Sequence, residues 1–145
     1  MTLLELVIAS TILIILASAA LPVGRTAIKR QKESELRRVL REVRTAIDRY
    51  KDAADRGLIQ VEIGTEGYPP DLDTLVRGVQ LAGAPDRRVR FLRKIPFDPM
   101  TGRDDWGLRS VQDDPDAATW GGKNVFDVYS RSQGIALDGT NYKDW

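Results

Sequence analysis

The carboxylates of Asp and Glu are the side chains of this sequence best suited to acid–base chemistry. The 145 residues include 21 Asp and Glu but no histidine and no cysteine. Imidazole general bases, thiolate nucleophiles, disulfides and most zinc sites are therefore excluded. The adjacent Asp104 and Asp105 come closest to an acid–base pair, but neighbouring side chains of a strand point to opposite faces, and solvated loop acids explain them better. The sequence predicts that the protein is not an enzyme.

One carboxylate, Glu5, stands at the start of an apolar stretch. No charged residue follows it between Leu6 and Gly24. Holding an isolated carboxylate in lipid costs at least about 2.5 kcal/mol, so Glu5 is a candidate functional residue that needs a cationic partner. The nearest candidate is a free amino group at Met1 of a neighbouring subunit, because the first helical turn has no Lys or Arg. Alternatively, Glu5 lies in the headgroup layer and favours the positive end of the helix dipole.

The stretch from Leu6 to Gly24 has the length and composition of a membrane span. It reads LVIASTILIILASAALPVG, and at about 1.5 Å per residue such a helix nearly crosses a hydrocarbon core of about 30 Å. A cleaved signal peptide would begin with basic residues, which are absent from Met1 to Leu4. We therefore expect a transmembrane helix. Pro22 lacks the N–H of a helical hydrogen bond, which predicts a kink or a local opening at that residue.

Helix-favouring residues extend this helix well beyond the apolar stretch. From Arg25 to Arg56 there is no Gly or Pro, and Gly57 is suited to end the helix. One side carries apolar residues at helical spacing, namely Leu36, Leu40, Val43, Ile47, Tyr50 and Ala54. The sequence thus predicts one long bent helix with an apolar half, residues 1–24, and an amphipathic half, residues 25–57.

Residues 58–145 differ in character, with frequent Gly and Pro and only short apolar runs. Asp71 is placed to cap a short helix within Pro70–Gly78. The strand candidates are Val89–Ile95, Leu108–Val111 and Val125–Tyr129, separated by turn-rich segments. We expect an α+β head in which a small antiparallel sheet packs on the long helix and the C-terminus is rich in loops.

Several motifs of this chain occur together in one protein family. The start Met1–Leu6, the apolar run and Pro22 resemble the mature N-terminus of type IV pilins and type II secretion pseudopilins. Downstream, Tyr68–Pro70, the Pro- and Gly-rich segment Ile95–Gly102 and Phe126–Ser130 resemble, in the same order, the major pseudopilin of type II secretion systems. The resemblance implies the type IV pilin fold and a subunit that polymerises into a helical filament.

In the family that this chain resembles, a prepilin peptidase cuts a basic leader before residue one and methylates the new amino terminus. The resemblance therefore implies that Met1 is a processed, N-methylated terminus and that Glu5 pairs with the amino terminus of a neighbouring subunit. Such pairing would set the register, because a mis-stacked carboxylate stays buried and unpaired. An assembly ATPase and a platform protein are the other implied partners. The subunit would cross the bacterial inner membrane once before assembly and form a periplasmic or extracellular filament afterwards.

Major pseudopilins hold their C-terminal loop with calcium, so the resemblance also suggests a metal site. Calcium takes about six to eight oxygen ligands, several of them from carboxylates. Asp138 and Asp144, with Ser130 and loop carbonyls, could supply part of this set, although Gln133 stands where the family usually has an aspartate. An ordinary Asp-Gly turn at Asp138 is the alternative. The sequence leaves both interpretations open.

Three functions agree with these features. The cysteine-free head and its motifs favour a secretion pseudopilus, and a surface pilus for adhesion or motility is the first alternative. A membrane-anchored binding module that does not polymerise is an alternative of another class, although a plain anchor gains nothing from Glu5. The net charge of +1, with acids and bases interleaved along the chain, gives no indication of nucleic-acid binding.

Overall fold

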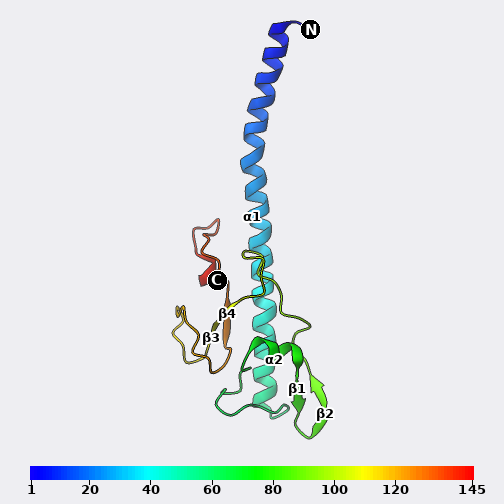
Figure 1. Ribbon diagram of the computed structural model, residues 1–145, viewed down its shortest axis with the longest axis vertical. Helices are drawn as coiled ribbons and strands as arrows, with labels where there is room; N and C mark the ends of the chain where they lie inside the picture. The colour runs from blue at the N-terminus through cyan, green and yellow to red at the C-terminus, as the bar shows by residue number, and fades with distance from the viewer.

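One helix, α1 (Leu3–Asp55), dominates the computed structural model, which describes residues 1–145 (Figure 1). Its N-terminal end stands at one extremity of an elongated molecule, and the head surrounds the other end. At that end Gly57 adopts a φ of 67°, and the N–H of Leu58 donates to the carbonyl of Ala53 at 2.9 Å. This Schellman arrangement favours glycine, which accepts the left-handed conformation without strain. The helix end predicted at Gly57 is therefore confirmed.

α1 continues through Pro22 and curves gently along its length (Figure 1). Proline removes one helical hydrogen bond, yet the residues on both sides keep the helical conformation. The hydroxyl of Thr26 donates to the carbonyl of Pro22 at 3.1 Å. The structure therefore shows one long curved helix with no opened turn at the proline.

The C-terminal half of α1 contributes one face to the core. Leu36, Val43 and Ile47 are all 0% exposed, because the rest of the head packs over the apolar face that the helical spacing creates. The predicted apolar stripe is confirmed except at its end, where Ala54 is only half-buried. The full buried set on α1 is Leu36, Val39, Leu40, Val43, Ala46, Ile47 and Tyr50.

α2 (Leu72–Arg77) is the short helix predicted between Pro70 and Gly78. Asp71 caps it as expected, since its carboxylate accepts from the main-chain N–H and the hydroxyl of Thr74 at 2.6 and 2.7 Å. Leu75 is fully buried and joins the core cluster to which α1 contributes. The cap and the apolar side of α2 thus fix this helix against α1.

The strands form two separate antiparallel pairs instead of the single small sheet that the sequence predicts. β1 (Val79–Leu81) pairs with β2 (Ala84–Val89), and β3 (Gly107–Arg109) pairs with β4 (Asp127–Tyr129). The two pairs lie on opposite sides of α1 (Figure 1). The molecule is therefore a long, N-terminally apolar helix packed on a small α+β head with two sheets, a layout consistent with that of pilins.

The strand predicted over Val89–Ile95 is wrong, because β2 ends where that strand would begin. The main-chain N–H groups of Phe91 and Leu92 donate instead to the carbonyl of Leu75 at 2.9 and 3.0 Å, just before the end of α2. These residues therefore close over α2 and have no strand partner. β3 and β4 overlap the two other predicted runs.

The Pro- and Gly-rich segment Ile95–Gly102 is a turn built on a buried carboxylate. Asp98 is 0% exposed, and it accepts hydrogen bonds from the N–H of Met100 at 2.8 Å and from the hydroxyl of Ser130 at 2.6 Å. A buried carboxylate requires such donors, since an unsatisfied one is costly. The Asp98–Ser130 bond joins this turn to the residue that follows β4.

Candidate assembly and membrane surface

The N-terminal half of α1 has no contact with the head. Every side chain from Met1 to Ile28 is exposed, and Ile14 and Leu21 expose 68% and 66% of their surface. α1 is, by length and composition, the one helix of the structure able to span a membrane. Each large apolar side chain costs about 1.5–3 kcal/mol when it is left in water instead of being buried. This surface therefore requires lipid or another protein around it.

Two hydroxyl groups inside the apolar stretch are satisfied by the helix itself. Thr11 donates to the carbonyl of Val7 at 2.7 Å, and Ser18 donates to the carbonyl of Ile15 at 2.7 Å. A hydroxyl that enters an apolar medium without a partner costs about 1–3 kcal/mol. These internal bonds remove that cost, so both residues suit lipid or a packed helix bundle.

Glu5 takes part in the cap at the start of α1. Its main-chain N–H donates to the hydroxyl of Thr2 at 3.2 Å, and its carboxylate accepts from the N–H of Thr2 at 3.4 Å. This is a capping box, and Met1 extends beyond it with 96% of its surface exposed. The spacing Thr2-x-x-Glu5 is the sequence signal for this cap, and the ion-pair interpretation overlooks it. Pairing between Glu5 and the Met1 amino group of another subunit stays a prediction.

The three predicted calcium ligands are engaged with different protein partners. Ser130 donates its hydroxyl to the buried Asp98, Asp138 accepts hydrogen bonds within its own turn, and Asp144 accepts from Asn141 at 3.2 Å. The structure contains no group of three or more acidic side chains that could hold a metal ion. Because calcium needs several carboxylates converging on one point, this donor set does not fit it. Asp138 matches the alternative of an ordinary Asp-Gly turn.

Direct contacts hold the C-terminal segment to α1. Glu33 accepts a hydrogen bond from the hydroxyl of Tyr142 at 2.9 Å. Arg37 lies 3.6 Å from the carboxylate of Asp138 and 4.2 Å from the ring centre of Trp145. Burial of Tyr142, together with its bond to Glu33, raises the pKa of the tyrosine hydroxyl to about 12. The segment is thus fastened by a carboxylate and a guanidinium of α1.

Arg44 is the third α1 residue in this arrangement. Its Nε donates to Asp127 at 2.6 Å, and its Nη2 donates to the main-chain oxygens of Val128 at 3.2 Å and Trp145 at 2.7 Å. One guanidinium therefore joins α1, β4 and the C-terminal segment. We call Glu33, Arg37 and Arg44 the C-terminal clasp. Sequence reasoning missed all three, because the residues they contact lie up to 109 positions away in the chain and charges on a helix surface look solvated.

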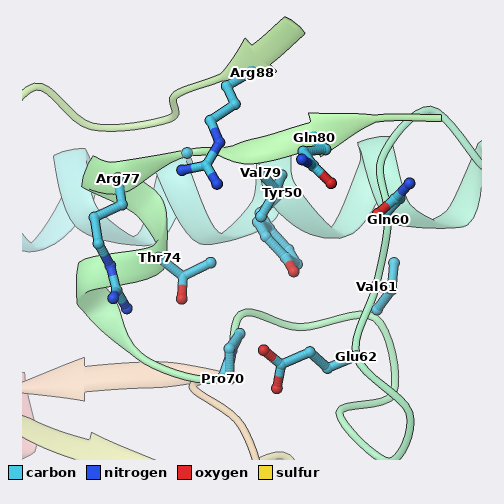
Figure 2. A pocket seen from close by; sticks show the side chains of 11 residues that line it. Tyr50, Gln60, Val61, Glu62, Pro70, Thr74, Arg77, Val79, Gln80 and Arg88 are labelled. Carbon is cyan, nitrogen blue, oxygen red and sulfur yellow. The ribbon is translucent and has the colours of Figure 1, made fainter. Parts of the chain in front are cut away.

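An open pocket of about 430 Å³ lies beside the end of α1, between α2, β1 and the segment that follows α1. Figure 2 shows Tyr50 directed into this pocket, with Arg77 and Arg88 on one side and Glu62 on the other. Burial raises the pKa of the Tyr50 hydroxyl, and the nearby Glu62 and Asp71 add to this effect. The pocket offers polar groups for binding. That the protein is not an enzyme stays a prediction.

Comparison with known proteins does not assign this chain to a family. No protein-family model, curated protein or solved structure matches it. The resemblance to type IV pilins therefore stays a prediction that rests on the motifs of the sequence. The structure agrees with it at a coarser level, because one long helix is free and apolar at its N-terminal half and carries a small α+β head at the other.

Proposed function

We propose that this protein is a structural subunit that polymerises into a helical filament, and that the filament is the pseudopilus of a type II secretion-like system. The observation that carries this proposal is the free apolar half of α1, where every side chain from Met1 to Ile28 is exposed. A helix of this kind needs an apolar environment on all sides. Lipid supplies that environment before assembly, and the helices of neighbouring subunits supply it afterwards.

The subunit waits in the inner membrane with Leu6–Gly24 in the hydrocarbon layer. The clasp begins at Glu33, about 14 Å further along the helix axis, so the head stands outside the bilayer. On extraction, the apolar side chains exchange lipid contacts for contacts with other α1 helices. A prepilin peptidase, an assembly ATPase and a platform protein are the helpers that this proposal implies.

Glu5 sets the register of the filament in this proposal. Its carboxylate forms only one long hydrogen bond in the cap, 3.4 Å from the N–H of Thr2, so it can turn to the Met1 amino group of a neighbouring subunit at little cost. In a packed helix bundle an unpaired carboxylate is strongly unfavourable, by about 3–5 kcal/mol when its partner is removed. Subunits stacked out of register would carry that penalty.

Two substitutions separate the charge of Glu5 from its capping role. Glu5→Gln removes the charge but keeps a side chain that can complete a capping box. Thr2→Ala removes the hydroxyl half of the cap and keeps the charge. We expect Glu5→Gln to remain in the membrane and to lower filament yield sharply, whereas Thr2→Ala assembles near the wild-type level. Normal filament yield from Glu5→Gln would remove the register argument.

Negative-stain electron microscopy of the full-length protein, produced with its leader and assembly machinery, tests the proposed function. Uniform thin filaments that contain this chain are the expected result. If the protein stayed dispersed in the membrane while a related pilin assembled in the same host, the anchored binding module would replace this proposal. The pocket beside Tyr50 would then be the first place to look for a ligand.

The use of the filament depends on its partners. A secretion pseudopilus is favoured here by the cysteine-free head, while a surface pilus for adhesion or motility is the alternative. Deleting the secretion ATPase that acts with the filament should stop protein export in the first case. In the second case, deleting a retraction ATPase should stop motility or adhesion and leave export intact.

A further inference from the structure

A basic groove of about 620 Å³ lies between α1 and the segment that follows β2. Its floor includes the apolar side chains of Ala46, Phe91 and Leu92, of which Ala46 and Leu92 are buried. Its charged lining consists of Arg38, Arg41, Glu42, Arg49, Arg93 and Lys94. We call this surface the basic groove. It combines an apolar floor with cationic walls, which suits a protein segment that carries carboxylates.

The positive charge of the basic groove is only partly used inside the subunit. Arg38 forms ion pairs with Glu35 at 2.5 Å and with Glu42 at 3.3 Å, so its single positive charge is shared between two carboxylates. The remaining four cations, Arg41, Arg49, Arg93 and Lys94, are exposed, and none of them belongs to the ion pairs of the subunit. With Glu35 included, the groove therefore carries a net excess of about three positive charges.

The loop between β3 and β4 carries Asp113, Asp114 and Asp116 and is held in an ordered shape by hydrogen bonds; we call it the acidic loop. Asp113 closes this loop by accepting from the N–H groups of Ser110 at 2.7 Å and Gly121 at 3.0 Å, which lowers the pKa of its carboxyl. Asp114 and Asp116 remain exposed and outside every ion pair of the subunit. The loop thus presents two carboxylates on a scaffold that needs little ordering when it binds.

The basic groove and the acidic loop lie on different flanks of α1. The groove includes the residues directly after β2, and the loop connects β3 to β4, which lies on the other side of the helix (Figure 1). The helix geometry agrees with this placement. Arg44 contacts β4 and Arg49, five residues later, lines the groove. Five residues of an α-helix rotate the direction of the side chain about the helix axis by about 140°. Complementary patches on two flanks cannot close on themselves within one molecule. They join one molecule to the next by a heterologous contact, which builds an open helical polymer when the rotation between successive copies does not close into a ring.

A membrane surface is a poorer occupant of the groove. Arg38, its lining residue nearest the apolar stretch, lies about 21 Å along the helix from Gly24. The screening length of charge at physiological salt is about 8 Å, so a headgroup layer near Gly24 would be largely screened from the groove. A protein partner with carboxylates is therefore favoured over lipid.

We propose that the basic groove of one subunit receives the acidic loop of a second copy of this chain, with Asp114 and Asp116 opposite Arg93 and Lys94. This inference rests on the proposed filament function and adds to it a contact between heads, separate from the packing of the apolar helices. The contact gives the polymer its lateral specificity, because like charges meet when the heads are rotated into other arrangements.

Exchanging the charges tests the contact in the full-length protein. Arg93→Asp/Lys94→Asp and Asp114→Lys/Asp116→Lys should each lower filament yield by about tenfold or more, a change that corresponds to about 1.4 kcal/mol. The chain that carries all four changes should recover most of the yield. Arg87→Asp, a substitution on β2 outside the groove, is the matched control and should assemble normally. Wild-type filament yield from both double variants, or no recovery in the combined variant, would overturn the inference.

Cysteine cross-linking separates this inference from the filament proposal. The natural chain has no cysteine, so Arg93→Cys/Asp116→Cys introduces the only thiols. A bismaleimide cross-linker, which spans the Cα separation of an Arg–Asp pair that a direct disulfide is too short to bridge, should produce a ladder of covalent multimers in membranes and filaments, whereas Arg87→Cys/Asp116→Cys should not. A ladder without filaments would support the head contact and refute the filament. Filaments without a ladder would refute the head contact alone, and the absence of both would refute both.

Discussion

Replacing Arg44 by alanine tests the C-terminal clasp directly. The guanidinium donates four hydrogen bonds, two to the carboxylate of Asp127 and two to the main-chain oxygens of Val128 and Trp145. A buried hydrogen bond to a charged group contributes about 1.5–3 kcal/mol, while an exposed ion pair contributes about 0–1 kcal/mol. The Arg44 side chain is 36% exposed, between these limits. We therefore expect Arg44→Ala to lower the free energy of unfolding by about 2 kcal/mol.

Urea unfolding of the full-length protein in non-ionic detergent, followed by tryptophan fluorescence, measures this loss. With a slope of about 2 kcal/mol per M urea, the midpoint should fall by about 1 M. Arg44→Lys keeps the charge but cannot form the planar fork, so it should give an intermediate midpoint. Arg49→Ala, an exposed residue of the same helix outside the ion pairs of the subunit, is the control and should change stability by no more than about 0.5 kcal/mol.

Unfolding of Arg44→Ala at the same urea concentration as Arg49→Ala would refute a stabilising role for the clasp. In that case the bonds between the guanidinium and the C-terminal segment would make no net contribution. A lower midpoint with an unchanged slope is the expected pattern, because the unfolded surface stays the same. A lower slope would mean that the segment had already detached in the native state.

Three further predictions concern the same head. Addition of EDTA to the purified protein should leave its thermal midpoint unchanged, because no set of three carboxylates lies close enough together to hold a metal ion. A drop in the midpoint that added calcium reverses would contradict this prediction and support a calcium site. Tyr142 has a folded pKa of about 12, above the ordinary value of about 10, so its contribution to stability is complete below about pH 10 and is lost as pH rises towards 12. The stability difference between wild type and Tyr142→Phe, measured by urea unfolding, should shrink over that range, and a constant difference would contradict the assignment. Gly107→Ala should destabilise the head by about 1–3 kcal/mol, because the new methyl group would meet the Tyr129 ring at 2.3 Å; a thermal midpoint equal to that of wild type would show that the ring moves aside freely.

Local features of the structure follow closely from the sequence. The end of α1 at Gly57 and the cap of α2 at Asp71 depend on residues within one or two helical turns of each other. The buried stripe that includes Leu36 and Ile47 follows from helical spacing alone. The capping box of Thr2 and Glu5 is also a local feature that the spacing Thr2-x-x-Glu5 predicts, since its two partners lie three residues apart.

The strands and the clasp could not be predicted in the same way. Residues Val89–Ile95 have the composition of a strand, and only the position of the Leu75 carbonyl diverts Phe91 and Leu92 to the end of α2. Strand pairing depends on which partner is available in space. A short apolar run therefore predicts that a segment is buried, but it does not predict which backbone groups the segment will hydrogen-bond to.

The sequence by itself determined the long helix, its division into an apolar and an amphipathic half, and most of the α1 residues that face the core. These depend on composition and on a period of about 3.6 residues, which act over short distances along the chain. Only the tertiary structure decided that Glu33, Arg37 and Arg44 hold the C-terminal segment and that the Ser130 hydroxyl donates to the buried Asp98. Each of these contacts joins residues more than 30 positions apart, so a charge that looks solvated in sequence finds its partner only when the head has folded around α1.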